Sequence, residues 1–247
     1  MSDKMEVYYF SPTGGTKKVS GIFVDAMEKE VIWHDLGSKK PMMEKPEGEM
    51  IVIAAPVFGG RIPSVVREKI EKLSGTGKKA VTIAVYGNRA YEDALLEMND
   101  ILMKCGFTVI ASGAFVAQHS MAPEVGAGRP DGEDEKEIHK FAESVKNSTA
   151  TENVHVPGNR PYKPELNMPV TPISLSSCTK CGKCVTICPT NAISVADGAV
   201  ITDTEKCILC MACTHVCTEQ ARIRPLPLQQ KTEQMLGALK GVRNKNE

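Results

Sequence analysis

The chain has little of what marks membrane, secreted or nucleic-acid-binding proteins. No apolar run reaches the roughly 18 residues of a membrane-spanning helix, so we expect no membrane span. No apolar signal segment follows Met1, which argues against a secreted protein and favours the cytoplasm. The 30 Lys and Arg residues are balanced by 30 Asp and Glu residues. A net charge of zero argues against a general nucleic-acid binder.

Cysteine is the residue type with the most informative arrangement. All but one of the nine cysteines fall in two runs of the same spacing. The runs are Cys178, Cys181, Cys184 and Cys188, followed by Pro189, and Cys207, Cys210, Cys213 and Cys217. A disulfide framework would need a secreted chain, and zinc sites use two Cys-x-x-Cys pairs rather than triplets with a distant fourth cysteine. The spacing instead indicates two [4Fe–4S] clusters.

The fourth ligand of each cluster is expected to come from the opposite run. Three thiolates at three-residue intervals wrap one face of a cubane, but a tight turn cannot supply the fourth. The expected ligand sets are Cys178, Cys181, Cys184 and Cys217 for one cluster, and Cys207, Cys210, Cys213 and Cys188 for the other. Thr218 stands where the first run has Pro189. Because proline there only stiffens the exit from the cluster, its loss bears on geometry and not on ligation.

The cluster segment is an internal repeat. Cys178 and Cys207 are 29 residues apart, and the same shift aligns every other cysteine of the two runs and Ala192 with Ala221. Between the runs, two short apolar segments flank Asp197-Gly198, which indicates a two-residue hairpin. Residues 173–226 resemble the bacterial dicluster ferredoxin domain, and the resemblance implies a small α+β domain that carries single electrons at low potential.

The first 150 residues are typical of an α/β domain. Continuous apolar runs alternate with helical patterns, and this alternation predicts a parallel sheet covered on both faces. The predicted strands are residues 5–10, 31–36, 50–55, 80–86 and 107–117, and helices are predicted after position 16 and near 64–73, 91–104 and 133–145. Five such strands suit the doubly wound flavodoxin-like fold, whose ligand lies at the carboxyl ends of the strands.

The loop of residues 11–16 follows the first predicted strand directly. It lacks the lysine of a Walker A loop and the spacing of a dinucleotide fingerprint. Its backbone amides at a helix N-terminus would favour a phosphate, although a plain turn and helix cap is the alternative. The candidate phosphate contacts are Ser11, Thr13, Gly14, Gly15 and Thr16. The loop resembles the flavodoxin phosphate loop Ser/Thr-x-Thr-Gly-x-Thr, which implies an FMN phosphate.

Two later loops extend the resemblance to the flavin ring. Phe58 and Tyr91 could cover the two faces of an isoalloxazine, or could simply pack; aromatic residues make up only 5% of the chain, which favours the first reading. In flavodoxins these loops hold the ring, and a glycine peptide there flips to bond flavin N5, a role for which Gly59 and Gly87 are candidates. The candidate ring contacts are Pro56, Val57, Phe58, Gly59, Gly87, Asn88, Arg89 and Tyr91.

The whole chain resembles the flavodoxin–ferredoxin fusion proteins of anaerobes. The resemblance also rests on residues 115–120 and 128–131. Within the first of these segments, His119 is the histidine nearest the expected site; it either forms a hydrogen bond within its loop or tunes or protonates the flavin. The resemblance implies an FMN domain at 1–150, a proline-rich linker at 151–172 and a 2[4Fe–4S] ferredoxin domain with a helical tail at 173–247. The linker either limits domain separation or is a mere spacer, and the tail packs on the body or on a partner.

Three functions from different classes fit this reading. The first is an electron carrier that joins FMN to two clusters and needs no catalytic acid, base or nucleophile. The second is an FMN-dependent reductase of a small substrate, fed by the ferredoxin domain. The third is a sensor, although no DNA-binding or signalling module is seen. About −2 charges per oxidised cluster would make the holoprotein acidic, so basic surfaces on redox partner proteins are expected; the sequence does not predict an oligomeric state.

Overall fold

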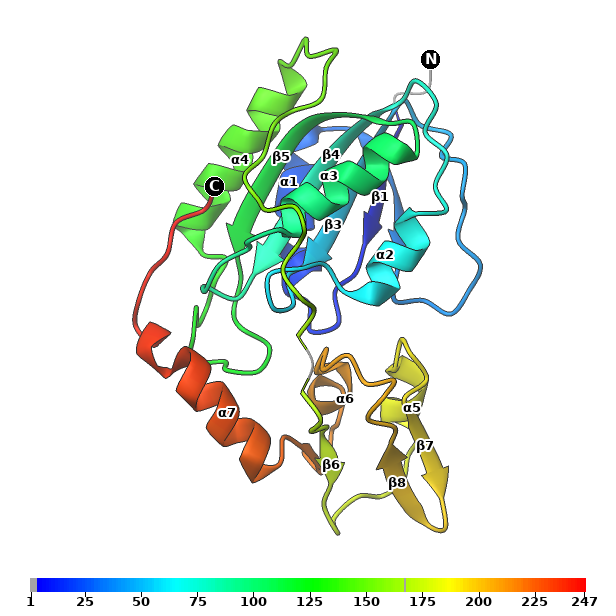
Figure 1. The fold of residues 1–247 in the computed structure, drawn as a ribbon, viewed down its shortest axis with the longest axis vertical. Coiled ribbons are helices and arrows are strands. Elements are labelled where there is room, and N and C mark those ends of the chain that lie inside the picture. The colour runs from blue at the N-terminus through cyan, green and yellow to red at the C-terminus, as the bar shows by residue number, and fades with distance from the viewer. Residues whose placement is uncertain (1–3, 167) are drawn as a thin grey trace.

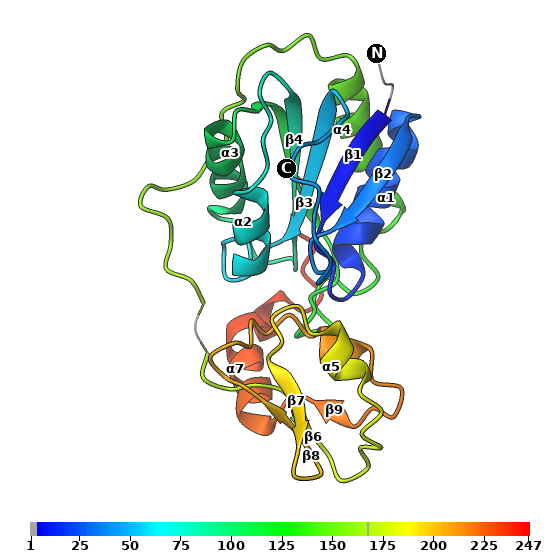
Figure 2. The same ribbon diagram turned by 90° about the vertical axis from the view of Figure 1, so that its right-hand side faces the viewer.

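The computed structural model describes residues 4–166 and 168–247. It contains two units, a larger α/β unit and a smaller unit that lies beyond the carboxyl ends of the strands of the first (Figure 1). The view turned by 90° shows the same stacking (Figure 2). In the described part of the chain, no helix is both long enough and apolar enough to cross a membrane.

The larger unit is built on a parallel sheet with the strand order β2-β1-β3-β4-β5. This is the flavodoxin-like order of a doubly wound sheet, and it confirms the predicted fold class. The chain crosses from one side of β1 to the other after β2, so the switch point lies between β1 and β3. The strands are β1 (Lys4–Tyr9), β2 (Glu30–Asp35), β3 (Met50–Pro56), β4 (Lys79–Tyr86) and β5 (Thr108–Val116).

Four helices cover the two faces of this sheet. On one face, Phe23 and Ile138 pack with Val7 and Val52 of the sheet. On the other face, a second cluster joins helical leucines and methionines to alternate sheet residues, because successive side chains of a strand point to opposite faces. The first face carries α1 (Gly15–Met27) and α4 (Gly132–Lys146), and the second carries α2 (Ser64–Ile70) and α3 (Ala94–Lys104).

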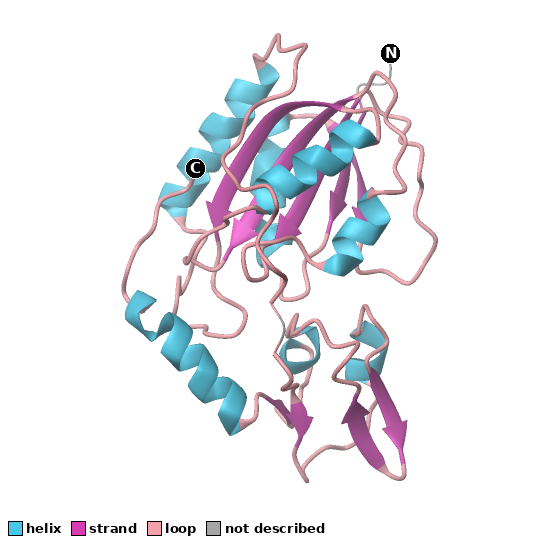
Figure 3. Cartoon of the chain, in the orientation of Figure 1, coloured by secondary structure: helices cyan, strands magenta, loops and turns pink. Residues whose placement is uncertain are grey.

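The smaller unit consists of two short antiparallel sheets and two single-turn helices (Figure 3). The predicted hairpin is present, with Ala196 paired to Ala199 across the turn. The strands are β6 (Ile173–Ser174), β7 (Ile193–Ala196), β8 (Ala199–Thr202) and β9 (Arg222–Ile223), and the helices are α5 (Lys183–Ile187) and α6 (Ala212–His215). β6 pairs with β9, so residues on both sides of the cysteine runs close the unit.

The proline-rich segment between the units is fixed along α3 and is not a free spacer. The backbone amide of Val154 donates to Val109 at 2.8 Å. The Asp93 carboxylate accepts the amides of Asn159 at 2.8 Å and Lys163 at 2.7 Å. These bonds hold residues 154–163 of the linker to the larger unit.

The C-terminal tail contacts both units. Helix α7 (Leu226–Leu236) and the 3-10 turn η1 (Gly237–Leu239) follow β9. Leu228 packs in the smaller unit, whereas Leu236 packs on Ala122 of the larger one. Residues 242–247 then run beside the end of β5, where the Glu247 amide donates to the Ala114 carbonyl at 2.8 Å. The tail therefore packs on the body of the protein and joins the two units.

Candidate functional site

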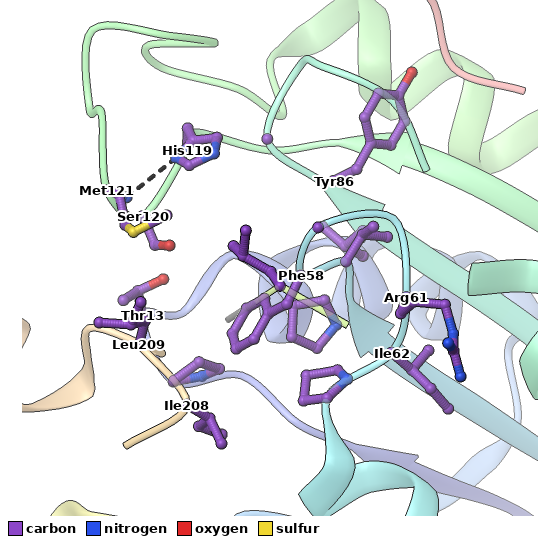
Figure 4. Close-up of a pocket in the computed structure, with 18 of the residues that line it drawn as sticks. Thr13, Phe58, Arg61, Ile62, Tyr86, His119, Ser120, Met121, Ile208 and Leu209 are labelled. Carbon is purple, nitrogen blue, oxygen red and sulfur yellow. Dashed lines mark hydrogen bonds between the residues drawn. The ribbon is translucent and has the colours of Figure 1, made fainter. Parts of the chain in front are cut away.

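A cavity of about 560 Å³ lies where the two units meet. The larger unit contributes the loops that follow β1, β3, β4 and β5, and the smaller unit contributes residues 204–209. Figure 4 shows Phe58 among side chains from both units, with His119 and Met121 on one loop and Ile208 and Leu209 on another. The cavity therefore occupies the place where doubly wound sheets bind their ligands.

The loop after β1 presents the N-terminus of a long helix to this cavity. α1 begins at Gly15, after Gly14 with a φ of 91°, a left-handed conformation that suits glycine. No side chain caps α1 at Gly14, and its first turn carries no acidic residue. Ser11, Thr13 and Thr16 line the cavity beside this helix end. The arrangement offers hydroxyl donors and a positive helix end, which suit a phosphate group.

The loop after β3 is a tight turn that presents Phe58. The amides of Phe58 and Arg61 each donate to the other residue's carbonyl, at 2.8 and 3.2 Å. Gly59 and Gly60 occupy the turn with φ angles of 61° and 94°, which explains why glycine is needed at both positions. Pro56, Val57, Phe58 and Gly59, which the sequence offers as candidate ring contacts, all line the cavity.

The carboxylate of Glu97 in α3 holds this turn in place. Its side chain is 1% exposed and accepts bonds from Arg61 Nε at 2.8 Å and Arg61 Nη2 at 2.6 Å. The same carboxylate accepts the Ile62 amide at 3.1 Å and Arg67 Nη1 at 3.3 Å. A single buried carboxylate thus fixes the direction in which the loop leaves β3.

We expect Glu97→Gln to destabilise the protein by about 3 kcal/mol, because removing one partner of a buried ion pair leaves the other charge uncompensated. The measurement is the free energy of unfolding from denaturant titration. Glu165→Gln is the matched control, since Glu165 also binds Arg67 but its side chain is 53% exposed, and exposed pairs contribute little. Equal losses in the two variants would contradict the anchoring role of Glu97.

The loop after β4 differs in part from the prediction. Gly87 and Arg89 line the cavity, but Asn88 and Tyr91 do not. The buried Asn88 side chain donates to the Val242 carbonyl at 2.8 Å. The Tyr91 hydroxyl donates to the Glu247 carboxylate at 2.7 Å. Both side chains bind the C-terminal tail and neither lines the cavity. The prediction that Tyr91 covers a flavin ring is therefore wrong.

His119 closes the cavity above Gly87. A Cβ added at Gly87 would lie 2.3 Å from His119 Cδ2, so only glycine leaves room for the imidazole. The Met121 amide donates to His119 Nδ1 at 3.1 Å, as the dashed line in Figure 4 marks. Burial, together with the charges of Arg224 and Arg89, lowers the pKa of His119 to about 4. The ring is therefore neutral at pH 7, with its proton on Nε2.

This lowered pKa predicts a loss of stability in mild acid. The unfolded chain binds a proton on His119 near pH 6.5 and the folded chain near pH 4, so the unfolded state holds more protons between these values and stability falls as the pH falls through that window. Between pH 7 and pH 5 the loss from this group is about 2 kcal/mol. We expect His119→Gln to remove that part of the pH dependence in denaturant unfolding; an unchanged slope would contradict the assignment.

One wall of the cavity was not predicted from the sequence. It comes from the linker, the smaller unit and the tail, and it is mostly apolar. Its members include Met168, Thr204, Glu205, Cys207, Ile208, Leu209, Met235 and Leu236. The sequence signal for this wall was the apolar pair Ile208-Leu209 after Cys207. Its place in the cavity depends on how the two units pack, which no local sequence pattern shows.

The eight cysteines of the two runs surround two further cavities, each lined by three cysteines of one run and one of the other. The first is lined by Cys178, Cys181, Cys184 and Cys217, and the second by Cys207, Cys210, Cys213 and Cys188. These are the sets that the spacing predicts. Within the described residues, no three His, Cys, Asp or Glu side chains lie close enough to hold a single metal ion; a cubane keeps its cysteine sulfurs farther apart.

The two kinds of cavity are adjacent. Cys207, Ile208 and Leu209 line both the large cavity and the second cysteine cavity. The first cysteine cavity shares no lining residue with the large one, and its Cys181 is exposed whereas Cys188, Cys210 and Cys213 of the second set are buried. Burial raises the pKa of the Cys210 thiol to about 12, so this thiol is protonated at pH 7 unless a metal binds it.

Comparison with known proteins identifies the smaller unit. Two family models described as "4Fe-4S binding domain" match residues 171–194 and 204–220. An uncharacterized ferredoxin-like protein of Haemophilus influenzae is 36% identical over 67 residues, which cover 25% of this chain and 78% of that protein. The polyferredoxin-like subunit of an aliphatic sulfonate oxidoreductase from Pyrococcus furiosus is 45% identical over 58 residues, covering 22% of this chain and 30% of that subunit.

Solved structures were compared as well. Oxidised flavodoxin 1 from Bacillus cereus aligns with 59% of this chain and 99% of its own length, at 17% identity and a TM-score of 0.45. The flavodoxin-like assignment of the larger unit rests on its strand order. This chain spans less than a third of the Pyrococcus subunit and about three quarters of the Haemophilus protein. Through its smaller unit, the chain belongs to the ferredoxin-like proteins that bind 4Fe–4S clusters.

Proposed function

We propose that the protein transfers electrons between two [4Fe–4S] clusters and FMN, and between these cofactors and redox partner proteins. The observation that carries the proposal is the shared wall of residues 207–209, which borders the large cavity on one side and a four-cysteine cavity on the other. When bound, FMN exchanges one or two electrons and each cluster exchanges one. A single chain would then join one-electron to two-electron chemistry.

The large cavity suits FMN by the chemistry of its two ends. The α1 N-terminus with Ser11, Thr13 and Thr16 would hold the phosphate. The half-buried Phe58 offers an apolar face for the ring. Val57 and Gly87 line the same cavity. A volume of about 560 Å³ is within the range of cofactor sites.

The cluster ligands are proposed to be the two sets that line the cysteine cavities, each with its fourth cysteine from the opposite run. In this assignment the set with Cys207 borders the FMN cavity, and the set with the exposed Cys181 is closer to solvent. Partner proteins would therefore bind near Cys181. The cluster of Cys207 would lie between that contact and the flavin.

A flavin-dependent reductase of a small substrate is the second candidate. Arg89 and the Nε2–H of neutral His119 place donors on the cavity wall, where a substrate could bind beside the ring. A reductase would turn over a substrate faster than it exchanges electrons with partner proteins.

The test is to reduce the clusters by a rapid light-driven donor and to follow flavin and cluster absorbance separately. The proposal predicts cluster reduction first and then flavin reduction at a rate independent of protein concentration, as expected within one molecule. A flavin rate that rises in proportion to protein concentration would contradict transfer across residues 207–209. Flavin that stays oxidised while the clusters are fully reduced would contradict the proposal as a whole.

A further inference from the structure

The smaller unit contains a buried cation that the ligand sets do not explain. Arg222 is 4% exposed. Its Nε is a buried polar side-chain atom without a hydrogen-bond partner, and among the described residues it is the sole atom of that kind. No ion pair with a carboxylate involves Arg222 in the described part of the chain. A buried charge is costly unless another charge compensates it, so the unpaired guanidinium needs an anion.

The guanidinium borders the first cysteine cavity. Arg222 lines the cavity of Cys178, Cys181, Cys184 and Cys217. Its Nη1 donates to the Ser174 hydroxyl at 3.1 Å and its Nη2 donates to the Thr202 hydroxyl, so neighbouring strands hold it in place. A buried cation thus faces the first ligand set.

The internal repeat shows that the fold does not require a charge at this place. The shift of 29 residues that relates Cys178 to Cys207 relates Ile193 to Arg222. Ile193 lines the second cysteine cavity as Arg222 lines the first. The chain therefore keeps a buried charge in one half of the repeat where the other half has an apolar side chain.

We propose that Arg222 is a countercharge that raises the reduction potential of the [4Fe–4S] cluster of Cys178, Cys181, Cys184 and Cys217. The inference rests on the clusters of the proposed function. Each cluster becomes more negative by one charge on reduction, and a nearby cation favours the more negative form. Burial leaves this interaction poorly screened by water or salt. Arg222 acts through the cluster's environment, and it binds no iron.

The experiment is a reductive titration of the complete protein followed by electron paramagnetic resonance, with iron counted in each sample. We expect Arg222→Met to keep about eight irons and to lower the midpoint potential of this cluster by at least a tenfold change in its reduction equilibrium, about 59 mV. Arg222→Lys should restore most of the shift, because it keeps the charge. Lys183→Met is the matched control: Lys183 lines the same cavity but is exposed to solvent, and its loss should change the potentials far less.

The outcomes separate this inference from the proposed function. Wild-type protein without about eight irons would reject the clusters themselves. Full iron content with equal potentials in wild type and Arg222→Met would overturn the countercharge. If Arg222→Met loses iron, Arg222→Gln and Arg222→Lys are compared instead. Lower potentials in the Gln variant than in the Lys variant support the inference, and equal potentials overturn it.

Discussion

Cys188→Ala is expected to remove about four of about eight irons and to stop electron transfer to the flavin while FMN stays bound. Cys188 lies in the first run of the sequence but lines the cavity of Cys207, Cys210 and Cys213. That cavity is the one that borders the large cavity. Iron and sulfide analysis, flavin content and the rapid reduction experiment measure the three parts of this result on one sample.

Cys217→Ala is the corresponding variant for the other cluster. Cys217 lines the other cavity, with Cys178, Cys181 and Cys184, so it should also cost about four irons but leave the cluster beside the flavin in place. Cys105→Ala is the control for the loss of a thiol, since Cys105 lies in neither cavity and contacts the Ile70 carbonyl of α2. If Cys188→Ala instead loses the cluster of its own run, the crossed ligation is wrong.

The double variant Thr13→Val with Thr16→Val is expected to weaken FMN binding by about a hundredfold or more, because each lost hydrogen bond to a charged group costs about 1.5–3 kcal/mol. Valine keeps the volume of threonine, which matters because Thr16, in the first turn of α1, is 3% exposed. Iron content should not change, since none of residues 11–16 lines a cysteine cavity. Fluorescence titration of the apoprotein with FMN measures the dissociation constant.

Thr204→Val is the control for this pair. Thr204 lines the same cavity from the smaller unit, and its hydroxyl is not among the proposed phosphate contacts. We expect near wild-type affinity in that variant. An unchanged FMN affinity in the double variant, or an equal loss in Thr204→Val, would contradict the phosphate assignment of residues 11–16.

The local sequence was sufficient to predict the elements that frame the site. Continuous apolar runs marked all five strands of the sheet to within two residues at each end, because strands buried on both faces contain few polar residues. The cysteine spacing predicted which thiols share a cavity, because a cubane limits how ligands can be arranged. Turn chemistry identified the hairpin at Asp197-Gly198.

What the sequence did not reveal depends on contacts between distant segments. Asn88 and Tyr91 follow a strand at the ligand end of the sheet, so they were natural candidates for the cavity, but residues 242–247 bind them. The linker was rich in proline, and its composition did not reveal that Asp93 and Asp100 of the larger unit fix it. The wall of Ile208 and Leu209 exists only because the two units pack together.

The most direct test of the account is cofactor stoichiometry on protein purified without oxygen: iron, acid-labile sulfide and released FMN per chain. The account predicts about eight irons, about eight sulfides and about one FMN at the large cavity. Eight irons without flavin, even after FMN is added to the reduced and the oxidised protein, would contradict it. The large cavity between the units would then hold a different ligand.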